Sequence, residues 1–176
     1  MPASHVDHPY AAIRREHTLD IDYDAFIHHL GSLLGTMDVA FLQQMPSYSP
    51  ESAREKHASL EGASGFVLFQ RLDHETVLTV LGGRPTRAMT YVFGNALIAV
   101  EMTKHSPRVG LYVPLRLLVY EIEPGRVAVT YDVASRALAQ YGSPKVDSVA
   151  RGLDAKVEQL VADAVRFSSL TMDNAS

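Results

Sequence analysis

The spacing of hydrophobic positions changes several times along the chain, and each change predicts a different element. Apolar residues recur at helical spacing over residues 26–41, which predicts a helix that follows a first strand over residues 14–21. A second helix is expected between Ser49, an N-cap residue that precedes a proline, and the stop at Gly62. The longest apolar stripe, over residues 146–164, predicts an amphipathic terminal helix.

Strand-forming residues dominate the middle of the chain. The expected strands cover residues 65–72, 87–93, 115–122 and 126–131. Glu123-Pro124-Gly125 is a turn sequence, so the last two strands should form a β-hairpin. A helical turn is expected over residues 73–81, and Asn95 should cap a short helix that ends near Lys104. This order predicts an α+β fold, in which helices pack on one face of an antiparallel-rich sheet.

The expected strands carry apolar residues on both faces. In residues 65–72, Phe66 and Leu68 alternate with Val67 and Phe69, and all four are apolar. A sheet that is covered by helices on one side only needs polar residues on the other side. We therefore expect the second face to be covered by another copy of the chain or to border a cavity that holds an apolar ligand.

Composition narrows the classes of function. The 176 residues are 47% hydrophobic and suit one domain, expected over residues 13–170 between tails at 1–12 and 171–176. The absence of cysteine excludes disulfides, thiolate nucleophiles and Cys-ligated metals. A net charge of -4, with no basic run longer than Arg14-Arg15, argues against nucleic acid as a partner.

Since no segment has the pattern of a signal peptide or a membrane span, we expect a cytoplasmic protein without membrane contact.

His74 is the candidate for a catalytic residue. It stands at the expected start of a helical turn, where the helix dipole disfavours the imidazolium, so that the neutral ring could accept a proton near pH 7. Asp73, which precedes it, could orient the ring. The alternative is a structural role for both residues, with Asp73 as a helix cap and His74 as a partly buried imidazole.

A second group of side chains could bind a small anionic or phenolic ligand. Tyrosines and arginines lie on or beside the expected strands, and together they could line one end of the sheet. The predicted ligand-binding residues are Arg71, Tyr91, Arg116, Tyr120, Tyr131 and His105, and Tyr112 and Arg87 belong to the same group. The alternatives are cross-strand aromatic pairs or dimer contacts for the tyrosines and an exposed loop position for His105.

The sequence assigns no metal ligands and leaves the cofactor unknown. The segment 20–31 begins like a calcium loop, but Ala25 and Gly31 occupy the positions that require Gly and Glu. A single imidazole in an apolar cavity is enough for axial haem ligation, and His29, His57, His74 and His105 are the available residues. Haem or metal binding through histidine therefore stays open as an alternative.

Several short motifs follow one another between residues 65 and 142. They are Gly65-Phe66-Val67, Leu72-Asp73-His74, Arg84-Pro85-Thr86, Phe93-Gly94-Asn95, Val113-Pro114-Leu115-Arg116, Val119-Tyr120-Glu121 and Val129-Thr130-Tyr131. In this order and spacing the segment resembles the bacterial domain of unknown function 302 family. Two features depart from the family pattern: the apolar run 96–103 replaces a proline after Phe-Gly-Asn, and a helical insertion precedes Gly65.

The resemblance implies a fold similar to the TATA-binding-protein-like superfold, in the order strand, helix, four strands, helix, and it suggests a homodimer. It places the Asp-His pair of the family on Asp73 and His74. It does not imply DNA binding, because a shared fold does not carry function.

These observations favour a homodimeric protein, paired through its sheet face, that binds a small molecule in a largely apolar cleft with His74 at the polar end. One alternative is an enzyme that acts on a small anionic or aromatic substrate with His74 as general base. The others are a haem or metal protein and a structural interaction module.

Overall fold

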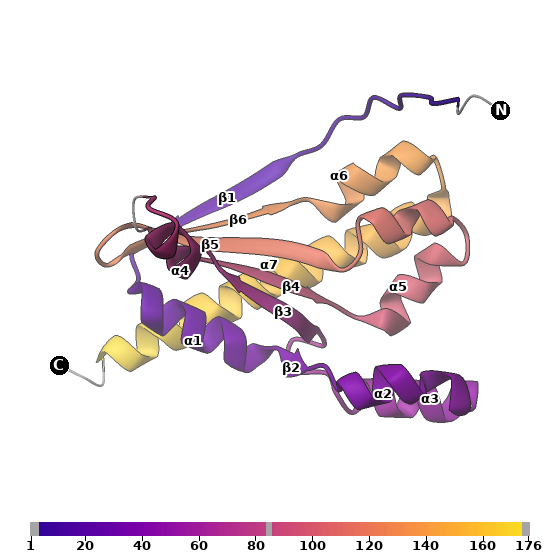
Figure 1. Ribbon diagram of the computed structural model, residues 1–176, viewed down its shortest axis with the longest axis horizontal. Coiled ribbons are helices and arrows are strands. Elements are labelled where there is room, and N and C mark those ends of the chain that lie inside the picture. Colours follow the sequence, from indigo (N-terminus) through magenta and orange to yellow (C-terminus); the bar gives the residue numbers. More distant parts are fainter. Residues whose placement is uncertain (1–3, 84–85, 174–176) are drawn as a thin grey trace.

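A six-stranded sheet forms the centre of the fold (Figure 1). The computed structural model describes residues 4–83 and 86–173 of the chain, so Arg84-Pro85 of the family motifs and the outermost residues of both expected tails lie outside it. Along the sheet the strands are β1 (Arg14–Leu19), β6 (Arg126–Asp132), β5 (Leu115–Glu123), β4 (Ala88–Gly94), β3 (Val67–Asp73) and β2 (Gly35–Thr36). All neighbours are antiparallel except β2 and β3, which are parallel.

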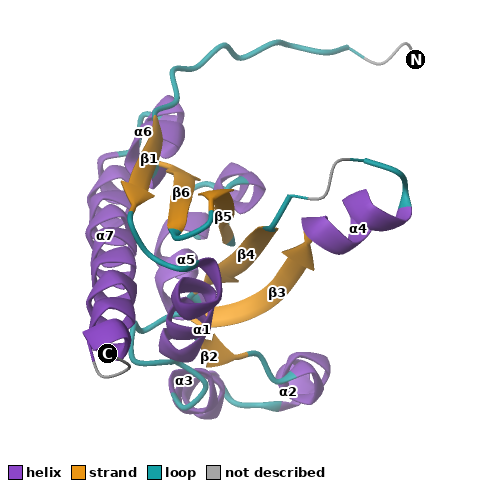
Figure 2. Cartoon of the chain, turned by 90° about the vertical axis from the view of Figure 1, so that its left-hand side faces the viewer, coloured by secondary structure: helices purple, strands orange, loops and turns teal. Residues whose placement is uncertain are grey.

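The helices lie mainly on one side of this sheet. The α-helices are α1 (Tyr23–Leu33), α2 (Val39–Gln44), α3 (Pro50–Ala58), α4 (His74–Val80), α5 (Ala96–Thr103), α6 (Ala134–Leu138) and α7 (Pro144–Asp173). Three short 3-10 helices are η1 (Met45–Ser47), η2 (Pro107–Leu111) and η3 (Ala139–Tyr141). The long helix α7 runs along one side of the sheet, and α1, α5 and α6 pack against it (Figure 2). The predicted α+β fold with helices on one face is therefore confirmed.

The core lies between α7 and the covered face of the sheet. Tyr91, Leu117 and Tyr131 are direct cross-strand neighbours on β4, β5 and β6, and all three are buried against the helices. On α7, burial repeats every three or four residues at Val146, Ala150, Leu153, Val157, Leu160, Val161 and Ala164. The apolar stripe predicted for the terminal helix is thus the surface that closes the core.

Short polar caps begin the helices where the sequence predicts them. Ser49 caps α3, Asp73 caps α4 and Asn95 caps α5, each with a side-chain oxygen that accepts backbone N–H bonds from the first turn. The predicted hairpin joins β5 to β6, and Gly125 in its turn has a φ of 81° that favours glycine. These positions depend on local chemistry alone, which explains why a sequence pattern finds them.

The helix expected over residues 26–41 is wrong, because the chain breaks after Leu33. Gly35 lies so close to a neighbouring loop that a side-chain carbon there would be 1.8 Å from the carbonyl oxygen of Leu60 and 2.6 Å from the nitrogen of Gly62. Its own N–H donates to the carbonyl of Phe66 at 2.9 Å, so this short stretch joins the sheet as β2. The apolar spacing continues across the break and conceals it.

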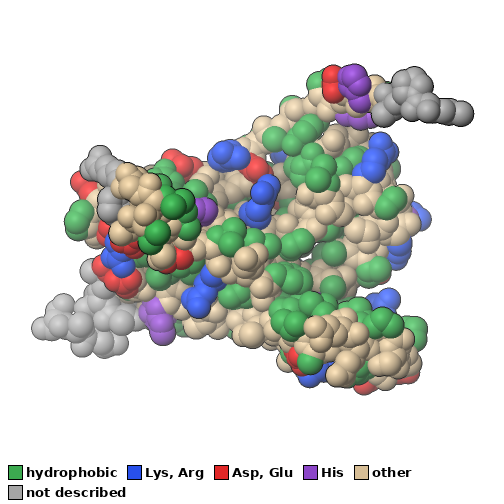
Figure 3. Space-filling view, in the orientation of Figure 1, with side chains coloured by type: hydrophobic (Ala, Val, Ile, Leu, Met, Phe, Trp, Pro, Cys, Tyr) green, Lys and Arg blue, Asp and Glu red, His purple; other side chains and the backbone are tan. Residues whose placement is uncertain are grey.

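The second face of the sheet, which we call the open face, has no layer of helices among the described residues (Figure 2). Its central row of cross-strand neighbours is Glu16, Thr130, Leu118, Thr90 and Leu72. In this row β1, β6 and β4 contribute polar side chains, and β5 and β3 contribute leucines, so the open face is mixed in character. Figure 3 looks onto the open face and shows hydrophobic side chains over its middle and over α4.

Candidate functional site

Asp73 and His74 form the junction between β3 and α4. The Asp73 carboxylate accepts the N–H groups of Glu75 and Thr76 at 3.0 and 3.2 Å and the hydroxyl of Thr76 at 2.6 Å. These bonds, those from Thr76 above all, lower the pKa of Asp73. The imidazole Nε2 of His74 lies 2.8 Å from the hydroxyl oxygen of Thr90 on the open face. Within the described chain the two side chains share no hydrogen bond, so the local geometry is that of a cap beside a half-buried imidazole.

Two of the predicted ligand-binding tyrosines face the helices. The Tyr91 hydroxyl donates to the carbonyl of Ile27 at 3.1 Å, and the Tyr131 hydroxyl lies 3.2 Å from Nε2 of His17. Burial raises the pKa of both phenols. Arg71 is the predicted residue that lies next to Tyr91, its direct partner across β3 and β4. These tyrosines therefore satisfy their hydroxyls inside the fold.

The remaining predicted residues lie elsewhere. Tyr120 is on the open face, where its hydroxyl donates to a carboxylate oxygen of Glu16 at 3.1 Å. Arg116 is exposed on the neighbouring part of β5, and His105 is exposed in the turn after α5. The predicted set is thus divided between the two faces and the ends of the sheet, and the structure does not bring it together as one site.

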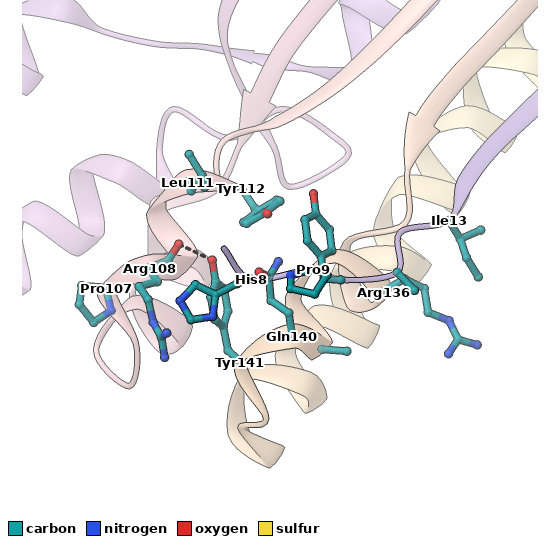
Figure 4. A pocket seen from close by; sticks show the side chains of 13 residues that line it. His8, Pro9, Ile13, Pro107, Arg108, Leu111, Tyr112, Arg136, Gln140 and Tyr141 are labelled. Atoms are coloured by element: carbon teal, nitrogen blue, oxygen red, sulfur yellow. Dashed lines mark hydrogen bonds between the residues drawn. The ribbon is translucent and has the colours of Figure 1, made fainter. Parts of the chain in front are cut away.

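A large open groove lies between the N-terminal segment and the turns at one end of the sheet (Figure 4). Its volume is about 980 Å³. It is lined by His8, Pro9, Tyr10, Ala11, Ile13, Pro107, Arg108, Leu111, Tyr112, Arg136, Ala139, Gln140 and Tyr141. We call it the tyrosine groove, and residues 4–13, which form one of its walls, the N-terminal arm.

Three aromatic rings meet edge to face in the tyrosine groove. The ring centroids of Tyr10 and Tyr112 are 5.8 Å apart at 84°, and those of Tyr112 and Tyr141 are 6.2 Å apart at 67°. The hydroxyl of Tyr141 donates to the backbone carbonyl of Arg108 at 2.8 Å, and the Arg108 guanidinium lies 5.1 Å from the centre of the Tyr141 ring. These contacts connect η2 to η3 and hold one side of the groove in place.

The tyrosine groove carries positive charge although the chain as a whole is acidic. Arg108 and Arg136 line it, no lining residue is Asp or Glu, and within the described chain neither guanidinium forms an ion pair. Hydrogen bonding with Tyr112 raises the pKa of Tyr10, and burial raises that of Tyr141. The hydroxyl of Tyr141 is already used in its bond to Arg108, so the groove offers mainly two guanidinium groups and aromatic rings. No carboxylate lines it, and the nearby charge of Asp132 contributes to the raised pKa of Tyr10.

A smaller hollow, the apolar cavity, lies where β4 ends and α5 begins. Its volume is about 140 Å³, and it is lined by Phe69, Gly94, Asn95, Ala96, Ala99, Met102, Val113, Pro114, Leu115 and Leu153. His74 is not among these residues. Its partner Thr90 precedes Gly94 by four positions on β4, which corresponds to roughly 13 Å along a strand. His74 therefore lines neither the apolar cavity nor the tyrosine groove.

The sequence predictions missed most of the tyrosine groove. Tyr10 falls in the segment assigned to a tail, and Arg108, Arg136 and Tyr141 lie in the short helices η2, α6 and η3, which no pattern predicted. The available indications were Pro107, which begins η2, and Gly142, whose φ of 60° ends η3. Of the predicted group, Tyr112 alone lines this groove.

The described chain has neither a cluster of metal-ligating side chains nor a membrane-spanning helix. Among residues 4–83 and 86–173, no three His, Cys, Asp or Glu side chains lie close enough together to hold a metal ion. In the same part of the chain, no helix combines the length and apolar character needed to cross a bilayer.

The family model of the domain of unknown function DUF302 matches residues 43–164, which is more than half of the chain. The chain belongs to the DUF302 family. A crystal structure of an uncharacterized conserved DUF302 protein from Bacillus stearothermophilus superposes with a TM-score of 0.60 at 14% identity, over 86% of this chain and 97% of that one. This likeness confirms the DUF302 fold. No curated protein matches the chain.

The tyrosine groove combines parts inside and outside the DUF302 match. Arg108, Tyr112, Arg136 and Tyr141 lie within residues 43–164, whereas the N-terminal arm precedes them. One wall of the groove thus belongs to the matched DUF302 region, and the other is supplied by the segment that leads into β1.

Proposed function

We propose that this DUF302 protein binds a small aromatic anion in the tyrosine groove. The observation that carries the proposal is the composition of the groove lining. Two arginines that form no ion pair within the described chain lie beside three tyrosine rings, and no carboxylate lines the groove. Guanidinium groups bind carboxylates through paired, charge-assisted hydrogen bonds, and tyrosine rings present flat apolar surfaces to an aromatic ligand. The open volume lies within the range of about 300–1,000 Å³ that is usual for small-molecule sites.

The experiment compares benzoate with benzamide, its neutral analogue, by isothermal titration calorimetry. We expect benzoate to bind more tightly, and we expect Arg136→Gln to weaken benzoate binding by about 10- to 100-fold because a charge-assisted hydrogen bond is lost. Arg151→Gln is the matched control, since Arg151 is an exposed arginine on α7 outside the groove. Equal binding of both compounds, or equal loss in both variants, would contradict the proposal.

We also propose that two copies of the chain pair through the open face. Helix α4 supports this because it leaves Val77, Val80 and Leu81 exposed at 53%, 75% and 79%, and Leu72 on the adjoining strand is exposed at 39%. Apolar side chains that cluster in this way mark interaction surfaces, and a two-fold pair covers the same patch on both copies.

Sedimentation equilibrium of the wild-type protein and of a Val80→Lys, Leu81→Lys variant tests this pairing. We expect twice the protomer mass of 19.3 kDa for the wild type and the protomer mass for the variant. Val39→Lys is the control, because Val39 is an apolar residue of similar exposure, 64%, that belongs to α2 and not to α4 or to the strands of the open face. A wild-type protein that remains a single protomer at high concentration would refute the pairing.

A further inference from the structure

The apolar cavity is bordered by five separate parts of the fold, including Leu153 of α7, and it opens to solvent beside Phe69, which is 38% exposed. Phe69 lies at a β-bulge in β3, Gly94 ends β4, Ala99 and Met102 belong to α5, and Pro114 precedes β5. A bulge changes the direction in which a side chain leaves its strand. The absence of a side chain at Gly94 leaves space beside Phe69 and Pro114, since a β-carbon there would be 3.6 Å from the Phe69 ring and 3.5 Å from Pro114.

Asn95 supplies the one polar side chain in this lining, and its hydrogen-bonding groups are already used. Its amide oxygen accepts the N–H groups of Leu97 and Ile98 at 2.8 and 3.1 Å. Its amide nitrogen donates to Glu61 at 2.7 Å and to the carbonyl of Gly65 at 2.9 Å. A buried water needs two to four polar partners, which the lining side chains do not offer. The cavity therefore favours an apolar occupant over water.

The volume sets the size of that occupant. An apolar cavity of about 150 Å³ engineered in another protein stays dry and takes up benzene or xenon, and the cavity at the start of α5 has about 140 Å³. We infer that it is a second binding site, which takes a neutral apolar group of the size of one aromatic ring. The site lies outside the tyrosine groove and differs from it in chemistry, because no charged side chain lines it.

Methyl NMR of protein labelled with ¹³C at its methionine methyl groups tests this site with benzene as the probe. Met102 lines the cavity and is fully buried, whereas Met37, Met45 and Met89 are partly exposed and lie outside it. We expect benzene to shift the Met102 signal to saturation and to leave the signals of Met37, Met45 and Met89 nearly unchanged. An unmoved Met102 signal at the solubility limit of benzene would overturn the inference, as would shifts of equal size at Met102, Met37, Met45 and Met89.

Two variants reduce the space in the cavity. Gly94→Ala adds one methyl group at ordinary van der Waals distances, so this variant should fold, and Ala99→Leu adds a larger apolar group from the opposite wall. We expect benzene affinity to fall at least threefold in the first variant and at least tenfold in the second. Gly152→Ala is the control, because a β-carbon at Gly152 meets no atom within 4 Å. Wild-type affinity in Gly94→Ala would overturn the assignment even if Ala99→Leu failed to fold.

A groove variant separates this inference from the proposed function. We expect Arg136→Gln to lose benzoate binding and to keep the benzene-dependent shift of Met102. Loss of benzene binding in Arg136→Gln would show that benzene occupies the tyrosine groove, and the cavity would then not be a site of its own.

Discussion

The backbone N–H of Ala96 donates a hydrogen bond to Nε2 of His57, 3.1 Å away. His57 lies on α3 and is 2% exposed, so this bond connects the helical segment between β2 and β3 to the first turn of α5. Because Nε2 accepts, the ring proton is on Nδ1, which lies 3.7 Å from a carboxylate oxygen of Glu61. His57 was one of the candidates for axial haem ligation. Its Nε2 lone pair is already used to accept the hydrogen bond from Ala96.

Loss of this contact should destabilise the protein. We expect His57→Ala to lower the free energy of unfolding by about 2–4 kcal/mol, because it removes a buried ring and leaves the N–H of Ala96 without its acceptor. Urea denaturation measures the effect. The exposed His105 is the control, and His105→Ala should change stability by less than about 0.5 kcal/mol. Equal stability of both variants would show that the contact between α3 and α5 contributes nothing.

Two glycines near the break after α1 should respond to alanine in opposite ways. At Gly35 the new β-carbon would overlap the backbone of Leu60, so we expect Gly35→Ala to cost at least about 3 kcal/mol. At Gly31 the β-carbon meets no atom within 4 Å, and Gly31→Ala should stabilise α1 by up to about 1 kcal/mol. Thermal unfolding of the two variants distinguishes them. A mild effect at Gly35 would mean that the loop at Leu60 yields easily.

His17 should make stability depend on pH. Burial and, to a smaller extent, the charge of Arg15 lower its pKa from the ordinary value of 6.5. The unfolded chain then binds this proton more readily, so the free energy of unfolding falls as the pH drops through 6.5 toward the lowered value. We expect the wild type to lose stability relative to His17→Gln over this range, measured by urea denaturation at a series of pH values. The opposite slope would show that Glu158, 4.0 Å from the ring, stabilises the charged form.

His74 should have no part in binding to the tyrosine groove. It lies with α4 at the end of the sheet opposite to η2 and the N-terminal arm (Figure 1). We expect His74→Ala to retain the benzoate affinity of the wild type, measured by calorimetry beside Arg136→Gln. A loss in His74→Ala with an unchanged fold would favour the alternative in which His74 contacts the ligand.

The sequence predicts the local elements of this fold well. Ser49, Asp73 and Asn95 act as caps because their side chains bond to the next few residues, and the stripe on α7 follows from helical spacing alone. The break at Gly35 could not be predicted in this way, since it depends on backbone that lies about 25 residues further along the chain.

The site was harder to predict than the fold. Whether a tyrosine faces the helices, as Tyr91 does, or the open face, as Tyr120 does, depends on strand register, which composition does not reveal. The tyrosine groove depends on irregular segments that are brought together by the pairing of β1 with β6. Asp73 and His74 could be located from the sequence, but their neighbours could not.

The two walls of the tyrosine groove are held in different ways. The wall from η2 and α6 is anchored by the fully buried Val109 and Leu138, so its shape is tied to the integrity of the interior. The N-terminal arm is exposed along its whole described length and leads into an edge strand. Substitutions in the arm should therefore reshape one wall of the groove with little effect on the stability of the interior, while the opposite wall keeps its arginines in a constant place.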